Sequence, residues 1–264
     1  MTPHTLNRLK DWFIEHTQAY EKNDPHEDNA YRLKIDHTLR VCDNIRRVGG
    51  SIGLIKGDNC LAQAIGLFHD IGRFKQFARY RTFSDAQSAN HARLSLQVLG
   101  RETIWHTLPL YERRLAAGAI AYHNAALLPD SAGPRALRFM RLIRDADKID
   151  IWKVVTEYYH RIEKTRNPTL ELGLPDTPAC TDKVVKTLAS RRFVRVEDMK
   201  SLNDFKLMQI SWVFDLNFRE SFRIVEERSV IDLIAAVLPR HPEMEAAIGA
   251  AKDYVHAMAR RLAT

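Results

Sequence analysis

Apolar residues recur along most of this 264-residue chain at the spacing of an α-helix. In the stretch YRLKIDHTLRVCDNIRRV, residues 31–48, the apolar positions Val41, Ile45 and Val48 share one helix face, and a pair of glycines follows as a helix stop. Alternation with a period of two, which is typical of strands, is scarce. The chain is therefore predicted to be all-α. Further helices are expected at residues 59–71, 88–99, 111–127, 135–163, 182–191, 203–227, 229–238 and 242–262.

One segment interrupts this helical pattern. Residues 165–181, TRNPTLELGLPDTPACT, contain three prolines and one glycine, which is typical of a loop. The later segment RRFVRVEDM has the composition of a short strand, but no strand is expected there. We predict a catalytic region at residues 1–163 and a helical C-terminal extension at residues 164–264, packed on the same domain.

Four of the 11 histidines lie at helical positions whose neighbours one turn away are mostly apolar. They are His37, His69, His91 and His123. Residues three and four apart share a helix face, so these imidazoles are expected to point toward the core. A single core histidine is usually just hydrogen-bonded, but burying four imidazoles is costly unless each has a partner. One metal site satisfies all four, since neutral imidazoles and carboxylates are ligands of Fe, Mn, Co, Ni and Zn.

Carboxylates complete the candidate ligand set. Asp70 directly follows His69, and the stretch RLIRDADKIDIW offers three more aspartates. Asp147 has isoleucines four residues before and after it, and is therefore expected to face inward. Asp145 has an arginine four residues before it and is expected to be more exposed, while Asp150 remains a candidate. We choose Asp147 as the second carboxylate ligand.

The order of these residues resembles the HD superfamily of metal-dependent phosphohydrolases. The segment FHDIGR resembles the histidine-aspartate doublet of that family, and RDADKID resembles its final aspartate motif, in which an aliphatic residue follows two places later. The resemblance covers about residues 31–155 and implies an HD-domain helical bundle with additional C-terminal helices. The minimal pattern of the family holds one metal ion through His37, His69, Asp70 and Asp147.

The two remaining histidines correspond to those that dinuclear members of the family use. The resemblance therefore implies two divalent ions, with Asp70 as the bridging ligand. The other ligands would divide into two sets, His37, His69 and Asp147 for one ion and His91 and His123 for the other. The implied reaction is hydrolysis of a phosphoester or phosphoanhydride bond by a metal-activated water, with Asp70 holding the bridging geometry and accepting a hydrogen bond from that water.

Basic residues follow the doublet at once and indicate an anionic substrate. The chain carries a net charge of +7 with histidine neutral, which favours anionic partners. An arginine fork matches a phosphate group, so we predict that Arg73 contacts a substrate phosphate, with Arg79 and Arg81 behind it. The alternative for each is a solvated loop. The predicted partner is a small phosphorylated molecule such as a nucleotide. Nucleic acid is less favoured, because no recognised binding module accompanies the charge.

Two other functions fit the same ligands. Mixed-valent diiron oxygenases of the HD superfamily, which cleave C–C or C–P bonds, use a similar set of four histidines and two aspartates. A non-catalytic, metal-stabilised nucleotide-binding or sensor module is the second alternative. A cyclic-dinucleotide phosphodiesterase is disfavoured, because AIAYHNAALLP lacks the Gly-Tyr-Pro motif of that branch and Arg73 stands where the branch has lysine.

Composition and the apolar runs of the chain indicate where in the cell the protein is expected. Apolar residues make up 45% of the chain and charged residues 28%, as in a globular protein, and the three cysteines show no CxxC spacing. The N-terminus has no apolar signal core, and the apolar run at residues 233–238 is too short to span a bilayer. We predict a cytoplasmic protein without membrane contact. The amphipathic C-terminal helices are compatible with a homo-oligomer.

Overall fold

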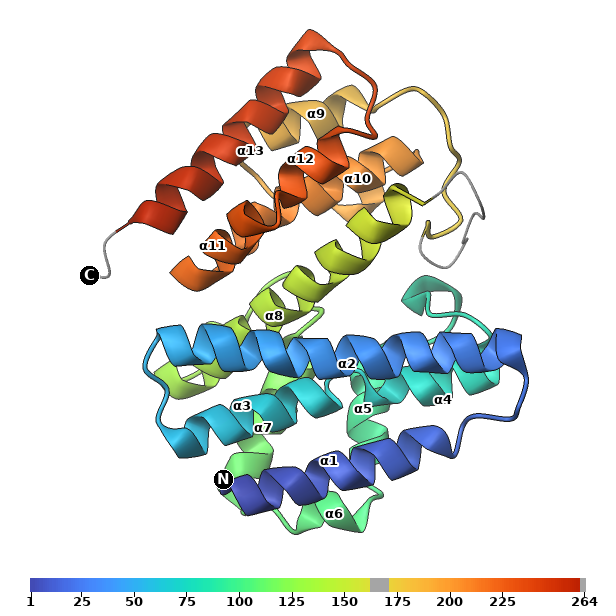
Figure 1. Cartoon of the computed structure of the whole chain (residues 1–264), viewed down its shortest axis with the longest axis vertical. Coiled ribbons are helices and arrows are strands. Elements are labelled where there is room, and N and C mark those ends of the chain that lie inside the picture. Colours follow the sequence, from blue (N-terminus) through green and yellow to red (C-terminus); the bar gives the residue numbers. More distant parts are fainter. Residues whose placement is uncertain (162–170, 262–264) are drawn as a thin grey trace. The chain divides into compact units, whose positions relative to one another are not determined.

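Helices account for all the regular structure in the part of the chain that the structure covers. The computed structural model describes residues 1–161 and 171–261 (Figure 1). Every element within these ranges is an α-helix or a short 3-10 helix, and the prediction of an all-α fold is confirmed. None of the described helices is long and apolar enough to cross a membrane.

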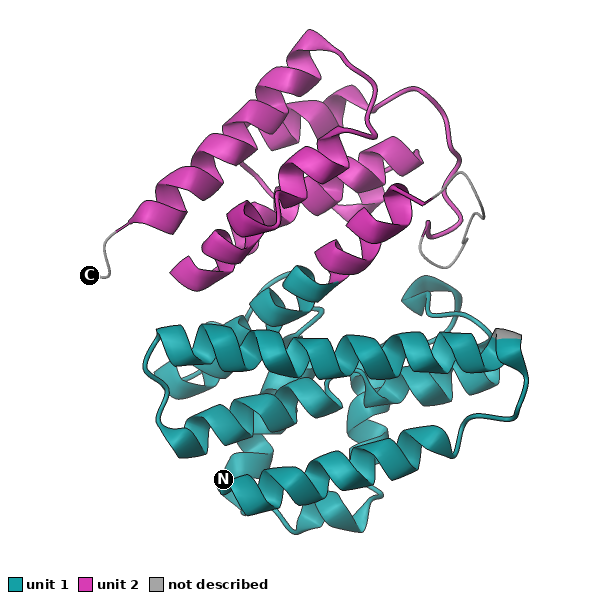
Figure 2. Ribbon diagram, in the orientation of Figure 1, with its two compact units in different colours: residues 1–150 teal, residues 151–264 magenta. Residues whose placement is uncertain are grey.

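The chain divides into two compact units, residues 1–150 and residues 151–264, coloured separately in Figure 2. In the first unit, α2 packs along α3, α4 packs along α5, and α3 also contacts α1 and α7. Its elements are α1 (Pro3–Gln18), α2 (Pro25–Ser51), α3 (Lys56–Phe68), α4 (Ile71–Tyr80), the 3-10 helix η1 (Asp85–Gln87), α5 (His91–Leu99), α6 (Thr103–His106), α7 (Leu110–Tyr122) and α8 (Pro134–Tyr159), the last of which continues into the second unit.

Aromatic rings join three helices of the first unit. The ring of Phe74 on α4 lies 6.2 Å from that of Phe13 on α1 and 6.1 Å from that of Tyr31 on α2, measured between centroids. All three side chains are fully buried. Each such side chain contributes roughly 1.5–3 kcal/mol of transfer free energy. This cluster fixes the start of α4, the helix that follows the histidine-aspartate doublet.

The second unit packs α13 along both α9 and α11. Its elements after α8 are α9 (Asp182–Ala189), η2 (Val196–Asp198), α10 (Leu202–Ser211), η3 (Trp212–Asp215), α11 (Arg219–Glu227), α12 (Val230–Ala235) and α13 (Pro242–Arg260). The segment RRFVRVEDM forms no strand, as expected. The single helix predicted over residues 203–227 is wrong, because extended backbone at Leu216 and Phe218 breaks it. There the side-chain amide of Asn217 donates to the Asp215 carbonyl oxygen and competes with the helical pattern.

The predicted boundary between residues 163 and 164 lies outside the described residues. The division of the chain into a catalytic region and a C-terminal extension at that point therefore stays a prediction. The observed units instead meet within α8, between Asp150 and Ile151. All six predicted metal ligands belong to the first unit.

Candidate metal centre

The six predicted ligands come from separate helices of the first unit, and four of them lie at helix ends. His69 caps the C-terminus of α3, and Asp70 is the N-cap of α4. His91 is the first residue of α5, and His123 caps the C-terminus of α7. His37 lies within α2 and Asp147 within α8. Because these ends belong to different helices, their side chains can approach one point from several directions. Residues along the face of a single helix could not.

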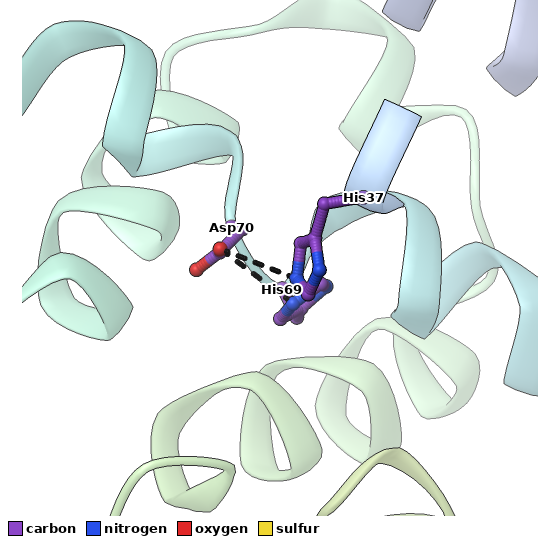
Figure 3. Close-up of side chains that lie close together, drawn as sticks. All are labelled: His37, His69 and Asp70. Carbon is purple, nitrogen blue, oxygen red and sulfur yellow. Dashed lines mark ion pairs between the residues drawn. The ribbon is translucent and has the colours of Figure 1, made fainter. Parts of the chain in front are cut away.

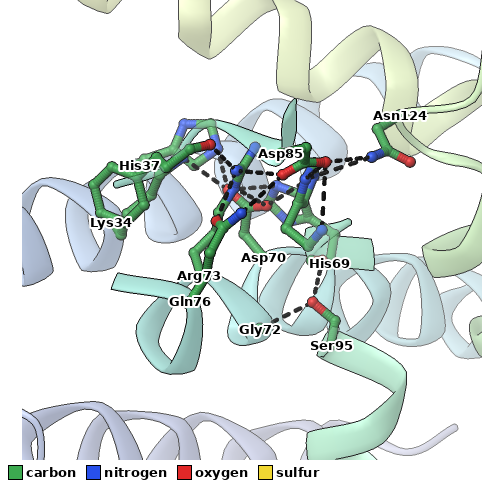
Figure 4. A network of polar contacts seen from close by, with 12 residues as sticks. Lys34, His37, His69, Asp70, Gly72, Arg73, Gln76, Asp85, Ser95 and Asn124 are labelled. Carbon is green, nitrogen blue, oxygen red and sulfur yellow. Dashed lines mark hydrogen bonds and ion pairs between the residues drawn. The ribbon is translucent and has the colours of Figure 1, made fainter. Parts of the chain in front are cut away.

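A glycine in the doublet motif allows two of these helix ends to meet. A Cβ atom on Gly72 would lie 2.3 Å from the backbone nitrogen of Ser95 and 2.5 Å from the carbonyl oxygen of His91, so only glycine fits between α4 and α5. The Ser95 hydroxyl accepts a hydrogen bond from the Gly72 N–H at 2.9 Å and donates one to the His69 carbonyl oxygen at 2.7 Å (Figure 4). This close contact places His91 beside Asp70.

The two carboxylate oxygens of Asp70 face different histidine pairs. Oδ2 lies 3.7 Å from Nε2 of His37 and 3.8 Å from Nε2 of His69 (Figure 3). Oδ1 lies 3.5 Å from Nε2 of His91 and 3.9 Å from Nε2 of His123. A carboxylate that bridges two cations through both oxygens presents one oxygen to each ligand set, and Asp70 has this arrangement.

Asp147 belongs with the first of these histidine pairs. Its Oδ1 lies 3.2 Å from Nε2 of His37 and 3.7 Å from Nε2 of His69. Candidate ligand atoms lie within 4.8 Å of one another in three groups, which are His37, His69 and Asp70, then Asp70, His91 and His123, and also His69, His123 and Asp147. Two of these groups agree with the sets that the resemblance implied and the third takes histidines from both, so the division into two ligand sets and the binding of an ion by each stay predictions.

The hydrogen bonds of the imidazoles fix which nitrogen of each ring is available. Nδ1 of His37 lies 2.7 Å from Asp150 Oδ2, and Nδ1 of His91 lies 2.7 Å from Asp85 Oδ2. Nδ1 of His69 and His123 lie 2.7 Å and 2.8 Å from the backbone carbonyl oxygens of Gly66 and Ile120. Carboxylates and carbonyls accept only, so in the neutral form of each ring Nδ1 carries the proton and Nε2 has a lone pair.

These free lone pairs fit a metal ion. Nε2 of His37 and Nε2 of His69 are buried and have no hydrogen-bond partner among the described residues. A buried polar atom without a partner costs about 1–3 kcal/mol, so such atoms call for another ligand. Two imidazole nitrogens and two carboxylates form a donor set that first-row divalent metals accept. The residues present therefore fit a metal centre.

Electrostatics keeps Asp70 and His123 in the protonation states that metal binding requires. Burial alone would raise the pKa of Asp70, but Lys34, His69 and Arg73 outweigh it and hold that pKa well below its usual range. Burial lowers the pKa of His123 to about 3, and the neighbouring ring of His91 adds to the effect. At neutral pH the carboxylate is therefore charged and the His123 imidazole is neutral.

The other carboxylate of the centre is held in its charged form by the same means. Burial would raise the pKa of Asp147, but the neighbouring imidazoles of His37 and His69 outweigh it and hold that pKa well below its usual range. The pKa of His37 is itself raised, because its contacts with Asp147 and Asp150 outweigh burial and the nearby charge of Lys34.

Arg73 lies at the centre, and one edge of its guanidinium is fixed. Nη1 donates to Asp85 Oδ1 at 3.0 Å, to Gln76 Oε1 at 2.9 Å and to the Phe83 carbonyl oxygen. Nε lies 3.5 Å from Asp70 Oδ1 and is buried without a hydrogen-bond partner among the described residues. Arg73 thus holds the segment after α4 and also faces the cluster.

The other two predicted substrate contacts lie at the far end of α4. Arg81 forms an ion pair with Glu27 at 2.6 Å, and the Arg79 guanidinium lies 5.2 Å from the ring centroid of Tyr80. This end of α4 is about 13 Å further along the helix axis than its first residue. A role for Arg79 and Arg81 in substrate binding stays a prediction.

One expectation about the carboxylates is wrong. Asp145 was expected to be exposed, but it is fully buried, whereas the Asp147 side chain is 18% exposed. Residues 142–146 of α8 are buried on every side of the helix, so the exposed arginine one turn earlier does not indicate an exposed face. Asp150 is buried too, and it pairs with Arg40 at 2.6 Å and with His37.

Two charged residues of the centre, Lys34 and Asp85, were not predicted to have a role there. The ammonium nitrogen of Lys34 lies 2.9 Å from Asp70 Oδ2, whereas Arg73 approaches the other oxygen of that carboxylate. Lys34 precedes His37 by three residues on α2, so the helix-face argument could have found it. Asp150, which the sequence left open as a ligand, contacts Nδ1 of His37. Asp85 lies in a segment without helical periodicity.

Fold and site together define an all-α protein with a histidine-rich centre built around one shared carboxylate. Residues 35–152 match the family model of the HD domain. This segment is therefore assigned as an HD domain, a kind of domain that generally binds divalent metals and occurs in metal-dependent hydrolases, and its His/Asp groups could hold a metal ion. Comparison with curated proteins and with solved structures finds no match.

Proposed function

We propose that this protein is a phosphohydrolase that cleaves a phosphoester or phosphoanhydride bond of a small phosphorylated molecule, with a nucleotide as the favoured class. One observation carries the proposal. The two oxygens of Asp70 face separate histidine pairs, and the same carboxylate is flanked by two positively charged side chains, Lys34 and Arg73. A centre for two cations with cationic side chains beside it suits an anionic substrate.

The ligand residues have defined tasks in this reaction. When bound, two divalent ions supply an acidified water as nucleophile and neutralise charge on the phosphoryl oxygens. Asp70 holds the two ligand sets together and accepts a hydrogen bond from the attacking water. Asp150 and Asp85 hold the rings of His37 and His91 with Nε2 turned toward Asp70.

The cationic residues bind and orient the substrate. Lys34 lies near Oδ2 of Asp70 and Arg73 near Oδ1, so a phosphate that approaches this carboxylate meets two positive charges. The Lys34 side chain is 18% exposed and the Arg73 side chain 15%. Charges act over a low effective dielectric in such a partly buried site, which strengthens their attraction for a phosphate. Arg79 and Arg81 are proposed to extend this positive region.

The setting of the protein follows from the same proposal. We infer a cytoplasmic enzyme whose partner is a small anionic metabolite rather than a membrane or a nucleic acid. The metals are proposed to be two ions from among Fe, Mn, Co, Ni and Zn. A homo-oligomer is compatible with this function but is not required by it.

The test combines metal analysis with an activity screen. Protein purified anaerobically is analysed for metal, and each of Mn, Co, Ni and Fe is added to the apo-protein before a screen of nucleotides and other phosphoesters. We expect about two equivalents of metal and release of phosphate that Asp70→Ala abolishes. Oxygen consumption by the iron form without phosphate release would instead support the diiron oxygenase, and metal binding without any turnover would support the sensor module.

A further inference from the structure

Asp85 collects hydrogen bonds from three segments around the second ligand set. Its Oδ2 lies 2.7 Å from Nδ1 of His91 and 3.3 Å from the amide nitrogen of Asn124. Its Oδ1 accepts from Arg73 and from Gln76, each at 3.0 Å (Figure 4). Asp85 lies in η1, between α4 and α5, and its side chain is only 30% exposed. One carboxylate therefore connects His91 to a predicted substrate contact.

The first ligand set has a counterpart of this arrangement. Asp150 Oδ2 lies 2.7 Å from Nδ1 of His37, and Arg40 donates to both oxygens of Asp150 at 2.6 Å and 3.0 Å. In each set, then, one histidine is held by a carboxylate that an arginine also contacts. The other histidine of each set, His69 or His123, is held by a backbone carbonyl of its own helix.

A carboxylate behind a histidine ligand affects metal binding in two ways. It fixes the ring with Nδ1–H toward the acceptor and Nε2 toward the metal, and it makes Nε2 a stronger donor. A backbone carbonyl also fixes the ring, but it increases the donor strength of Nε2 less than a carboxylate does, because it carries no net charge. Loss of such a carboxylate typically costs 10–100-fold in metal affinity.

We propose that Asp85 is the positioning residue of the second ligand set: through Nδ1 of His91 it controls metal binding by His91 and His123, while Asp150 does the same for His37 in the first set. The proposal rests on the dinuclear centre of the proposed function. Asp85 thereby acts on the second ligand set and Asp150 on the first, although both carboxylates lie within one cluster. Asp85 does not touch the metal itself, and it acts through the imidazole that it orients.

The experiment measures Mn²⁺ binding to the apo-protein by equilibrium dialysis in two single-site backgrounds. His37→Ala weakens the first set and leaves the second, and His91→Ala does the reverse. Asp85→Ala is expected to weaken the remaining ion about 10–100-fold in the His37→Ala background. The His91→Ala background lacks the imidazole that Asp85 orients. There, Asp85→Ala is expected to change the Mn²⁺ affinity by less than about 2-fold. Asp150→Asn is expected to show the opposite pattern.

Two further variants separate positioning from folding. Asp58→Asn removes another aspartate-arginine ion pair of the same unit, to Arg135, and is expected to leave Mn²⁺ binding unchanged in both backgrounds. Asp85→Asn keeps the volume and one carbonyl oxygen, so it reports on the lost charge if Asp85→Ala does not fold. Asp85→Asn is expected to weaken the second ion in the same direction but by less.

The outcomes distinguish this inference from the proposed function. Equal weakening by Asp85→Ala in both backgrounds, or none in the His37→Ala background, would overturn the positioning role. A wild-type protein that binds no Mn²⁺ would overturn both proposals. Wild-type protein that binds two ions and shows the expected pattern, but cleaves no phosphoester, would overturn the proposed function alone. Hydrolysis by a protein whose Asp85→Ala form binds Mn²⁺ normally would overturn this inference alone.

Discussion

Nε2 of His91 and Nε2 of His123 lie 2.8 Å apart inside the first unit. Both rings point Nδ1 at an acceptor, the carboxylate of Asp85 and the carbonyl oxygen of Ile120, so both facing nitrogens carry lone pairs. Burial lowers the pKa of each of these histidines, which keeps both rings neutral at pH 7. Two lone pairs at this distance repel each other, and a cation bound by both removes the repulsion.

Metal removal should therefore destabilise the protein. A ligand that binds only the folded state stabilises it by about 2.7 kcal/mol at one hundred times its dissociation constant. We expect chelator-treated protein to unfold several degrees lower than protein saturated with Mn²⁺, as measured by scanning calorimetry. The difference should shrink in His91→Ala, which has already lost one ion. Equal Tm values for both wild-type samples would contradict a metal-stabilised core.

The count of bound ions tests the division into two ligand sets. His91→Ala or His123→Ala should reduce the metal content from about two equivalents to about one, since both donate to the same ion. Hydrolysis should fall by at least ~10–100-fold, the loss that is typical even when only a hydrogen-bond partner of a metal ligand is removed. Elemental analysis and phosphate release measure the two effects. Full metal content with normal turnover in either variant would make that histidine an ordinary core residue.

Asp147 and Asp145 provide a matched pair of substitutions on one helix. Asp147→Ala should remove metal from the first set, because Asp147 Oδ1 faces His37 and His69. Asp145→Ala should leave metal content nearly unchanged and instead lower stability by about 1–3 kcal/mol, since Asp145 is fully buried. Metal analysis together with urea unfolding separates the two effects. The reverse pattern would show that Asp145 is the ligand.

Helical periodicity was sufficient to predict part of this centre from the sequence. It gave the all-α class and the inward direction of His37, and the apolar neighbours of each histidine were visible in the chain. It failed where a side chain depends on contacts from elsewhere. The helix predicted to reach residue 127 ends at Tyr122, where Arg144 of α8 donates to the carbonyl oxygens of Tyr122 and Ala125. Asp85 likewise lies outside any periodic segment, so its role could not be predicted.

Lys34 offers a test of substrate charge that leaves the metal ligands intact. Lys34→Met keeps most of the side-chain volume and removes the positive charge beside Asp70. We expect kcat/KM for a phosphoester to fall at least about 10-fold, which corresponds to about 1.4 kcal/mol, with the metal content unchanged. Lys75→Met makes the same change on α4 and should keep kcat/KM near the wild-type value. Equal kcat/KM in both variants would exclude Lys34 from substrate binding.

The contact between α4 and α5 predicts opposite effects for two glycine substitutions. A Cβ on Gly72 would lie within 2.3–2.7 Å of backbone atoms of Ser95, His91 and Leu94, and backbone cannot move aside as a flexible side chain can. Gly72→Ala should destabilise the protein by at least the ~1–3 kcal/mol typical of overpacking, and it should weaken metal binding by shifting His91 from Asp70.

Gly50 is the matched control for this last prediction. It lies in the final turn of α2, and a Cβ added there would have no neighbour within 4 Å, so the methyl group meets open space. Gly50→Ala should stabilise the protein by about 0.5–1 kcal/mol, because alanine loses less conformational entropy on folding, and should leave metal content unchanged. Urea unfolding and metal analysis of both variants test the pair. A Gly72→Ala protein with wild-type stability and full metal content would show that α4 and α5 do not meet as closely as the structure places them.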